Sequence, residues 1–141
     1  MSLDENFVSF ASVLVIPSIL VVDRELGFMF ALSQALRKRR IAAIPACSVA
    51  EAETLIADLR PELAVLVINC SCPGVCAFAM ELRQRLSQLQ VVGITYPGRQ
   101  CRQCAPVLAA TLKHPEDRRP DRIEHCAELV SSLIKKAHAY Q

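Results

Sequence analysis

The stretch that decides the fold is PELAVLVINCSCPG, residues 61–74. It has six consecutive apolar residues at 63–68, reaches the polar Asn69, and closes with a turn at Pro73 and Gly74. An unbroken Val/Leu/Ile run bounded by turn residues predicts a strand buried on both faces, as in parallel sheets covered by helices on both sides. Ligands gather at the carboxyl ends of such strands, so Asn69 marks the place to look for function.

Strand and helix patterns alternate along the rest of the chain. Strands are expected at residues 19–23, 41–46, 63–68, 90–95 and 107–112. The first helical pattern predicts an inward face of Leu26, Met29, Phe30, Ser33 and Leu36. Only a turn or two of helix fits between the fourth and fifth strands. This order predicts an α/β fold, a three-layer, doubly wound, five-stranded parallel sheet with a shortened or remodelled fourth helix.

The composition suits one domain. The chain has 141 residues, 52% apolar and 21% charged, which supplies a single core and argues against disorder. We expect residues 1–18 to form a lead-in or an extra strand, with Val13 to Ile16 as its apolar part, and residues 19–141 to form the domain.

The net charge and the hydropathy pattern exclude several classes of binding partner. A net charge of +2 is too small to indicate a nucleic-acid or membrane partner, and the scarcity of aromatic residues argues against base stacking. The apolar stretch at residues 10–22 is interrupted by Pro17 and Ser18 and lacks a basic lead, so it predicts neither a membrane span nor a signal peptide. A cytoplasmic location is expected.

The chain contains seven cysteines, an odd number that argues against a disulfide scaffold. Five follow the third and fourth strands and are expected to converge: Cys70, Cys72, Cys76, Cys101 and Cys104. Our favoured interpretation is that they fill space as small apolar side chains, as Cys47 and Cys126 are expected to do. The alternatives are a zinc or iron–sulfur site, and a redox pair formed by Cys101 and Cys104.

Several of these segments resemble a response-regulator receiver domain, the flavodoxin-like module of two-component signalling. The resemblance rests on ILVVD at residues 19–23, RPELAVLVIN at 60–69, the Pro-Gly pair after it, Thr95 and Lys113, and it covers residues 19–140. It implies the receiver topology for the predicted sheet. It also implies a Mg²⁺-dependent pocket in which an aspartate at the end of the third strand accepts a phosphoryl group.

The pocket implied by the resemblance is degenerate. Asp23 matches the first metal-binding acid, Thr95 the hydroxyl residue and Lys113 the lysine, but Arg24 replaces the second acid and Asn69 replaces the phosphoacceptor. An amide is a far poorer nucleophile than a carboxylate, and Mg²⁺ prefers anionic oxygen ligands. We expect Arg24 to take the cation position, pairing with Asp23 and hydrogen-bonding Asn69. An ion pair between Asp23 and Lys113 is also expected.

The sequence therefore predicts a pseudo-receiver, a non-enzymatic signalling module that keeps the fold without the phosphorylation chemistry. Its expected partner is a signalling protein or a second copy of the chain, bound through the fourth loop, the fifth strand and the last helix. No cofactor is expected. The alternative function is a metal or redox sensor built from the cysteines.

Overall fold

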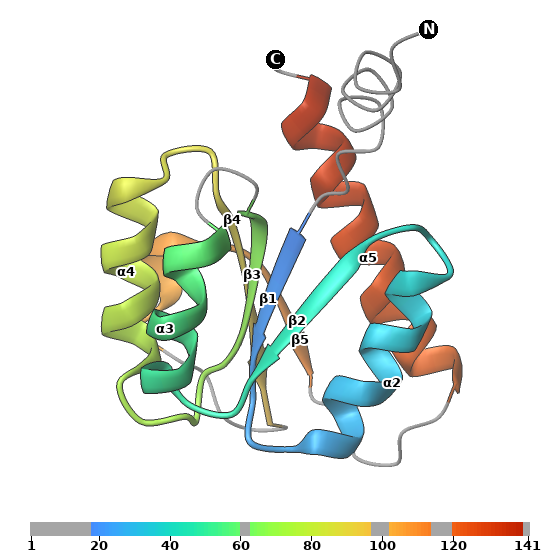
Figure 1. Cartoon of the computed structure of the whole chain (residues 1–141), viewed down its shortest axis with the longest axis horizontal. Coiled ribbons are helices and arrows are strands. Elements are labelled where there is room, and N and C mark those ends of the chain that lie inside the picture. The colour runs from blue at the N-terminus through green and yellow to red at the C-terminus, as the bar shows by residue number, and fades with distance from the viewer. Residues whose placement is uncertain (1–17, 60–62, 97–101, 114–119, 140–141) are drawn as a thin grey trace, which may run out of the picture.

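The computed structural model describes residues 18–59, 63–96, 102–113 and 120–139 (Figure 1). Its elements, in chain order, are β1 (Ser18–Val22), α2 (Leu26–Arg37), β2 (Ala42–Ala46), α3 (Val49–Leu59), β3 (Leu63–Asn69), α4 (Val75–Arg85), β4 (Gln90–Thr95), the short 3-10 helix η2 (Ala105–Val107), β5 (Leu108–Lys113) and α5 (Pro120–Ala139). The extra strand expected at residues 13–16 lies outside the described residues.

The strands form one parallel sheet in the order β2-β1-β3-β4-β5, which confirms the predicted topology. The register aligns Val22 with Ile68, Asn69 with Ile94, and Thr95 with Lys113. Strands in such a sheet run the same way, so Asn69, Thr95 and Lys113 all end at one edge. This carboxyl edge is the part of the fold that positions the candidate site.

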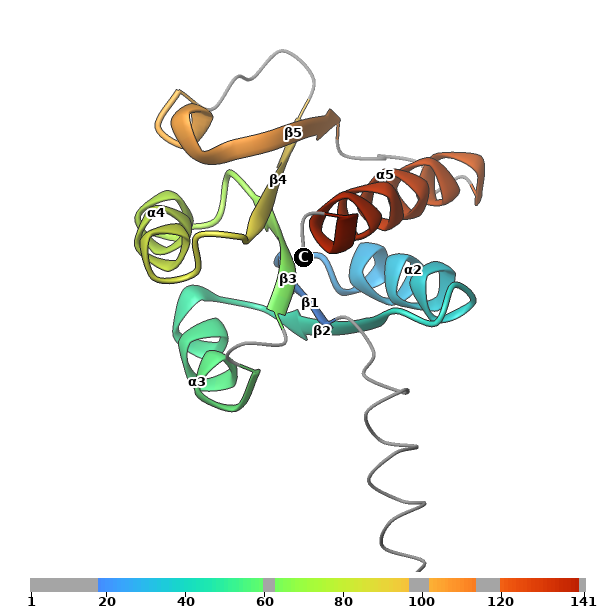
Figure 2. The same ribbon diagram turned by 90° about the horizontal axis from the view of Figure 1, so that it is seen from above.

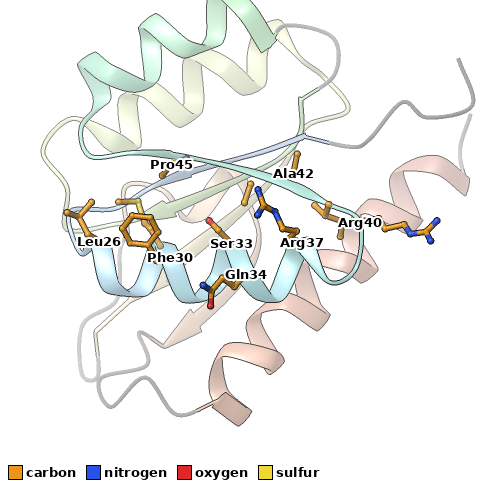
Figure 3. A pocket seen from close by; sticks show the side chains of 11 residues that line it. Leu26, Phe30, Ser33, Gln34, Arg37, Arg40, Ala42 and Pro45 are labelled. Carbon is orange, nitrogen blue, oxygen red and sulfur yellow. The ribbon is translucent and has the colours of Figure 1, made fainter. Parts of the chain in front are cut away.

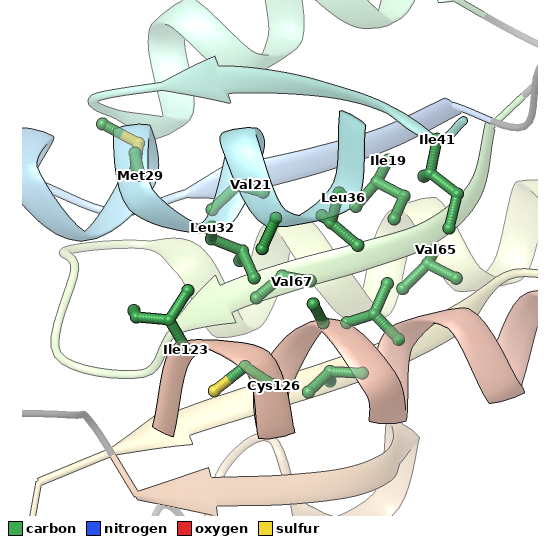
Figure 4. Packing of buried hydrophobic residues seen from close by; sticks show 14 of the residues in the cluster. Ile19, Val21, Met29, Leu32, Leu36, Ile41, Val65, Val67, Ile123 and Cys126 are labelled. Carbon is green, nitrogen blue, oxygen red and sulfur yellow. The ribbon is translucent and has the colours of Figure 1, made fainter. Parts of the chain in front are cut away.

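Helices cover both faces of the sheet, as Figure 2 shows, with α2 and α5 on one face and α3 and α4 on the other. One apolar cluster lies beneath α2 and α5 (Figure 4) and a second beneath α3 and α4. The β1 strand and most of β3 are buried on both faces, because their Val, Leu and Ile side chains alternate between the two clusters. The continuous apolar run in the sequence therefore reflects its central place.

The predicted inward face of α2 is wrong in part. Phe28, Met29, Leu32, Ala35 and Leu36 are its buried side chains, whereas Leu26 is 53% exposed and Phe30 is 65% exposed. Two overlapping sets of apolar residues in this helix both have helical spacing, so periodicity alone does not choose between them. The helix rotates the set containing Phe28 and Leu32 toward the core and leaves Leu26 and Phe30 on its outer side.

Local signals at two helix starts behave as their chemistry requires. The Ser48 hydroxyl accepts a hydrogen bond from the Glu51 backbone N–H at 3.2 Å, which caps α3 as the sequence predicts. Gly74 precedes α4 with a φ of 75°, a left-handed conformation that glycine adopts without steric cost. The turn after Asn69 is thereby closed, and α4 starts directly behind the site.

The fourth helix is remodelled as predicted, because only the three-residue η2 stands between β4 and β5 among the described residues. The register of β4 with β5 shifts after Val91, and Leu112 then packs on the α2/α5 side. Side chains alternate along a strand, so Thr111 and Lys113 point to the opposite face, where they are exposed. A short η2 therefore leaves part of β5 uncovered.

Candidate functional site

The carboxyl edge of the sheet collects the five residues predicted for the degenerate pocket. Asp23 and Arg24 follow β1, Asn69 ends β3, Thr95 ends β4, and Lys113 ends β5. Asp23 is 1% exposed and Asn69 is 2% exposed, so these two form the buried floor. Thr95 is half-buried, and Arg24 and Lys113 are exposed at the rim.

The Asn69 side chain is the centre of a hydrogen-bond network. Its Nδ2 donates to Asp23 Oδ1 at 3.1 Å and to the Tyr96 hydroxyl at 3.4 Å. Its Oδ1 accepts from the Ser71 backbone N–H at 2.9 Å and from the Ser71 hydroxyl at 2.6 Å. Asp23 Oδ1 also accepts the Glu25 backbone N–H at 3.0 Å, which fixes the carboxylate in place. Both ends of the amide are therefore saturated with protein partners.

This network does not fit Mg²⁺. The cation would need the oxygens of residues 23 and 69 turned toward a shared position, and it prefers carboxylates there. Instead, the Asn69 NH₂ group donates directly to the Asp23 carboxylate, while the Asn69 carbonyl oxygen is already held by two donors from Ser71. An N–H donor has no lone pair to offer a metal, so the amide nitrogen that faces Asp23 cannot serve as a metal ligand.

Three expected contacts of the rim residues do not form. Arg24 makes neither an ion pair with Asp23 nor a hydrogen bond to Asn69. Its exposed side chain lies instead beside the Cys72 thiol. Lys113 is exposed and makes no ion pair with any described residue, so its expected pair with Asp23 is wrong. Both are long, flexible cations whose hydration competes with pairing at a protein surface. Thr95 contributes position only, because its hydroxyl makes no hydrogen bond within the described residues.

Two residues in the network, Ser71 and Tyr96, were not predicted from the sequence. Ser71 follows Asn69 by two positions, and an asparagine side chain commonly accepts the backbone N–H two residues on, so this contact had a local signal. Tyr96 follows the predicted strand end at Thr95 and brings its hydroxyl to Asn69 across the sheet edge. That contact depends on the pairing of β3 with β4 and had no local signal.

The cysteines converge partly as predicted, but our favoured interpretation as free apolar fillers is wrong for Cys76 and Cys104, which are bonded to each other. Cys76 in the first turn of α4 and Cys104 at the start of η2 form a disulfide with their Cα atoms 5.1 Å apart. The expected pair of Cys101 and Cys104 is therefore wrong in this structure; Cys101 itself lies outside the described residues. The reason is that Cys104 is fully buried against α4 and faces inward. The disulfide joins η2 to the helix behind the site.

The two other described cysteines of this group, Cys70 and Cys72, form no disulfide. Cys70 lies over β4, where its Sγ would be 3.2 Å from a Cβ placed on Gly93, so a bare backbone makes room for it. Cys72 is buried; burial raises the pKa of its thiol, the Asp23 carboxylate adds to the rise, and Arg24 opposes it. Among the described residues, no three His, Cys, Asp or Glu side chains are grouped to hold a metal ion.

The two cysteines outside this cluster differ in environment. Cys126 is buried in α5 as expected, and burial raises the pKa of its thiol. Cys47 is exposed after β2, so its expected role as an apolar filler is wrong. It follows the last residue of an edge strand, where no helix covers the side chain. Cys47 is therefore a free surface thiol.

Comparison with solved structures gives response-regulator receiver domains. A response regulator from Thermotoga maritima is 17% identical with a TM-score of 0.71, over 85% of this chain and 98% of that one. A receiver-domain protein from Clostridium thermocellum is 14% identical with a TM-score of 0.72, over 89% and 100%. An atypical orphan response regulator is 11% identical with a TM-score of 0.68, over 84% and 95%.

These likenesses establish that the chain has the fold of receiver domains. They are structural, because no protein-family model and no curated protein sequence matches the chain. The similarity between this chain and receiver domains is therefore one of fold and not of sequence. Within the part of the chain that the structure describes, every helix is too short or too polar to cross a bilayer.

Proposed function

We propose that the chain is a pseudo-receiver, a non-enzymatic module of signal transduction that binds a protein partner without being phosphorylated at the end of β3. The observation that supports this proposal is the hydrogen bond from Asn69 Nδ2 to Asp23 Oδ1. It holds the phosphoacceptor position in a neutral, fully bonded state. A receiver built in this way has no step at which a phosphoryl group would change its conformation.

The chemistry of the floor supports the loss of phosphorylation in two ways. The amide nitrogen of Asn69 shares its lone pair with the carbonyl group, and the oxygen already accepts two hydrogen bonds, so neither atom is a nucleophile. Asp23 Oδ1 already accepts the N–H of Glu25 and the NH₂ of Asn69, so a Mg²⁺ ion could be ligated without displacing them only through the other oxygen of this carboxylate. The atypical orphan response regulator with the same fold has a phosphorylation-independent regulatory mechanism.

The binding surface that we propose combines β5 with η2 and α5. The short η2 leaves Thr111 and Lys113 exposed on β5, and β5 is the end strand of the sheet formed by the described residues. A partner or a second copy that packs here would cover this edge, which natural proteins otherwise protect. Location in the cytoplasm and self-association remain part of this proposal.

The phosphorylation part is tested with beryllofluoride, a phosphoryl mimic that needs Mg²⁺ and an aspartate. Amide NMR spectra of labelled protein are compared before and after both are added. The proposal predicts no shifts at Asp23, Asn69 or Thr95; saturable shifts there would overturn it.

The proposed binding surface is tested by sedimentation velocity of Thr111→Arg against a Gln88→Glu control. A concentration-dependent dimer that only Thr111→Arg dissociates supports this surface, and a dimer that both retain contradicts it.

A second candidate function, a thiol redox sensor, is favoured by the disulfide between Cys76 and Cys104. The two thiols would reduce a small-molecule disulfide to two thiols and lose two protons and two electrons in forming the bond. That bond fastens η2 to α4, next to the uncovered part of β5. Its formation would therefore couple the redox state of the cell to the proposed binding surface.

Mass spectrometry of alkylated peptides separates the two candidates. Protein purified anaerobically is treated with reduced or oxidised glutathione, alkylated and digested, with Cys104→Ser as the control. The sensor predicts a reversible crosslink between Cys76 and Cys104 in the oxidised sample. Complete alkylation of both residues in every sample, or a crosslink to Cys101, would contradict it. Elemental analysis of the same protein tests the zinc and iron–sulfur alternative directly.

A further inference from the structure

A groove of about 850 Å³ lies between α2 and the edge strand β2, on the opposite side of the molecule from β5 (Figure 3). Its walls are largely apolar, and Leu26, Met29 and Phe30 from α2 face Ala42 and Pro45 from β2. Arg37 and Arg40 lie at one end. None of the residues of the degenerate pocket lines it.

The apolar side chains that line this groove are unusually exposed, which indicates that another segment or molecule covers them. Leu26 and Phe30 are 53% and 65% exposed, and they are the two most exposed large apolar side chains of the described residues. They lie beside a strand that ends the sheet of the described residues. Adjacent exposed apolar side chains at a concave site usually mark an interaction surface.

We propose that the groove is covered by the chain's own residues 7–16, FVSFASVLVI. Eight of these ten residues are apolar, the other two are serines, and none is charged, so the segment gains by leaving water. The groove offers the matching apolar surface along α2 and β2. The proposal concerns the contact between these surfaces and holds for a helical or an extended segment.

Connectivity favours the chain's own segment over a second copy. Ser18, where the described structure begins, is paired in register with Ala42, and Ala42 lines the groove. The segment is therefore attached beside the groove without a long linker. Ten residues span about 15 Å as a helix or about 33 Å when extended. The twelve-residue α2 is about 18 Å long, so either form runs along much of the groove. Such tethering supplies an effective concentration of about a millimolar.

The test uses a fluorescent reporter in the full chain. The protein contains no tryptophan, so Phe30→Trp places a single reporter in the groove. Met80→Trp is the control reporter, because Met80 is 40% exposed on α4, which covers the other face of the sheet. Each reporter is combined with Phe10→Asp and Leu14→Asp, which fall on one side of the segment whether it is a helix or a strand.

The matched control carries Ser2→Asp and Asn6→Asp, with the same spacing and the same added charge outside residues 7–16. We expect Phe10→Asp with Leu14→Asp to move the emission of the Phe30→Trp reporter to the red and to raise its quenching by acrylamide several-fold. The control pair and the Met80→Trp reporter should show no change. All described core residues lie after residue 17, so the protein should stay folded, and its far-UV circular dichroism spectrum should not change.

Two outcomes would overturn the proposal. If the Phe30→Trp reporter is equally quenched with the wild-type segment, with Phe10→Asp and Leu14→Asp, and with the control pair, residues 7–16 do not cover the groove. If its emission shifts to the red on dilution through the micromolar range, the occupant comes from a second copy, since a tethered segment is insensitive to protein concentration.

Discussion

The substitution Asn69→Asp tests the network at the carboxyl edge most closely. It changes an NH₂ donor into a carboxylate oxygen at the position 3.1 Å from Asp23 Oδ1, with both residues at most 2% exposed. Two carboxylates centred about 4 Å apart repel by about 4 kcal/mol at an effective dielectric constant of 20. The alternative is protonation of one of them, which costs about 4 kcal/mol at pH 7 for an unfolded-state pKa of about 3.9.

Both routes predict that Asn69→Asp lowers the free energy of unfolding by about 3 to 4 kcal/mol at pH 7. The shared site raises a carboxyl pKa in the folded state above its unfolded value. Stability relative to the wild type is therefore preserved below the unfolded pKa and is lost as the pH rises toward the folded pKa. At pH 5 the protonation cost falls to about 1.5 kcal/mol, and the deficit should shrink accordingly.

The assay is urea unfolding followed by far-UV circular dichroism at pH 7 and pH 5. The control is Gln88→Glu, which makes the same amide-to-carboxylate change at an exposed position after α4 and should stay within about 0.5 kcal/mol of the wild type. An Asn69→Asp protein as stable as the wild type at pH 7 would refute the contact between Asn69 and Asp23. A deficit that is equal at both pH values would refute the electrostatic cause.

Three further predictions concern the disulfide, the free cysteines Cys47 and Cys126, and Tyr96. Cys76→Ser should lower the free energy of unfolding by about 3 kcal/mol in oxidising buffer and by far less in excess reductant, because the disulfide closes a loop of 28 residues. Urea unfolding in both buffers measures this loss, and equal losses in the two buffers would contradict the crosslink. Native alkylation at pH 8 should modify Cys47 first and Cys126 late, because Cys47 is exposed while burial raises the pKa of the Cys126 thiol; peptide mapping over time measures the order, and early modification of Cys126 would contradict its burial. Tyr96→Phe should cost at most about 1 kcal/mol in unfolding experiments, since its hydrogen bond to Asn69 is long and only partly buried; a much larger loss would mean that Tyr96 anchors the site.

The fold could be predicted from the sequence because the strongest patterns in the sequence are those that a parallel sheet requires. The apolar run at residues 63–68 predicted the central strand, and the short segment after Thr95 predicted the remodelled fourth helix. The face of α2 was harder, because Leu26 and Phe30 share the helical spacing of the core residues. Spacing shows that a helix is amphipathic; which side faces inward depends on the neighbouring elements.

The site was predicted at the level of residues and less well at the level of contacts. Strand order placed Asp23 and Asn69 together, but the saturation of Asn69 by Ser71 and Tyr96 depends on the exact turn and register. The disulfide shows the same limit. Cys101 and Cys104 have a familiar spacing in the chain, whereas Cys76 meets Cys104 only because η2 folds against α4.

Intact-protein mass spectrometry after incubation with acetyl phosphate and Mg²⁺ tests the central claim of a non-phosphorylated receiver. The amide of Asn69 is bonded at both ends and is not a nucleophile, so we predict an unchanged mass for the wild type with or without Mg²⁺. The addition of a single phosphoryl group that requires Mg²⁺ and maps to the carboxyl edge of the sheet would contradict it.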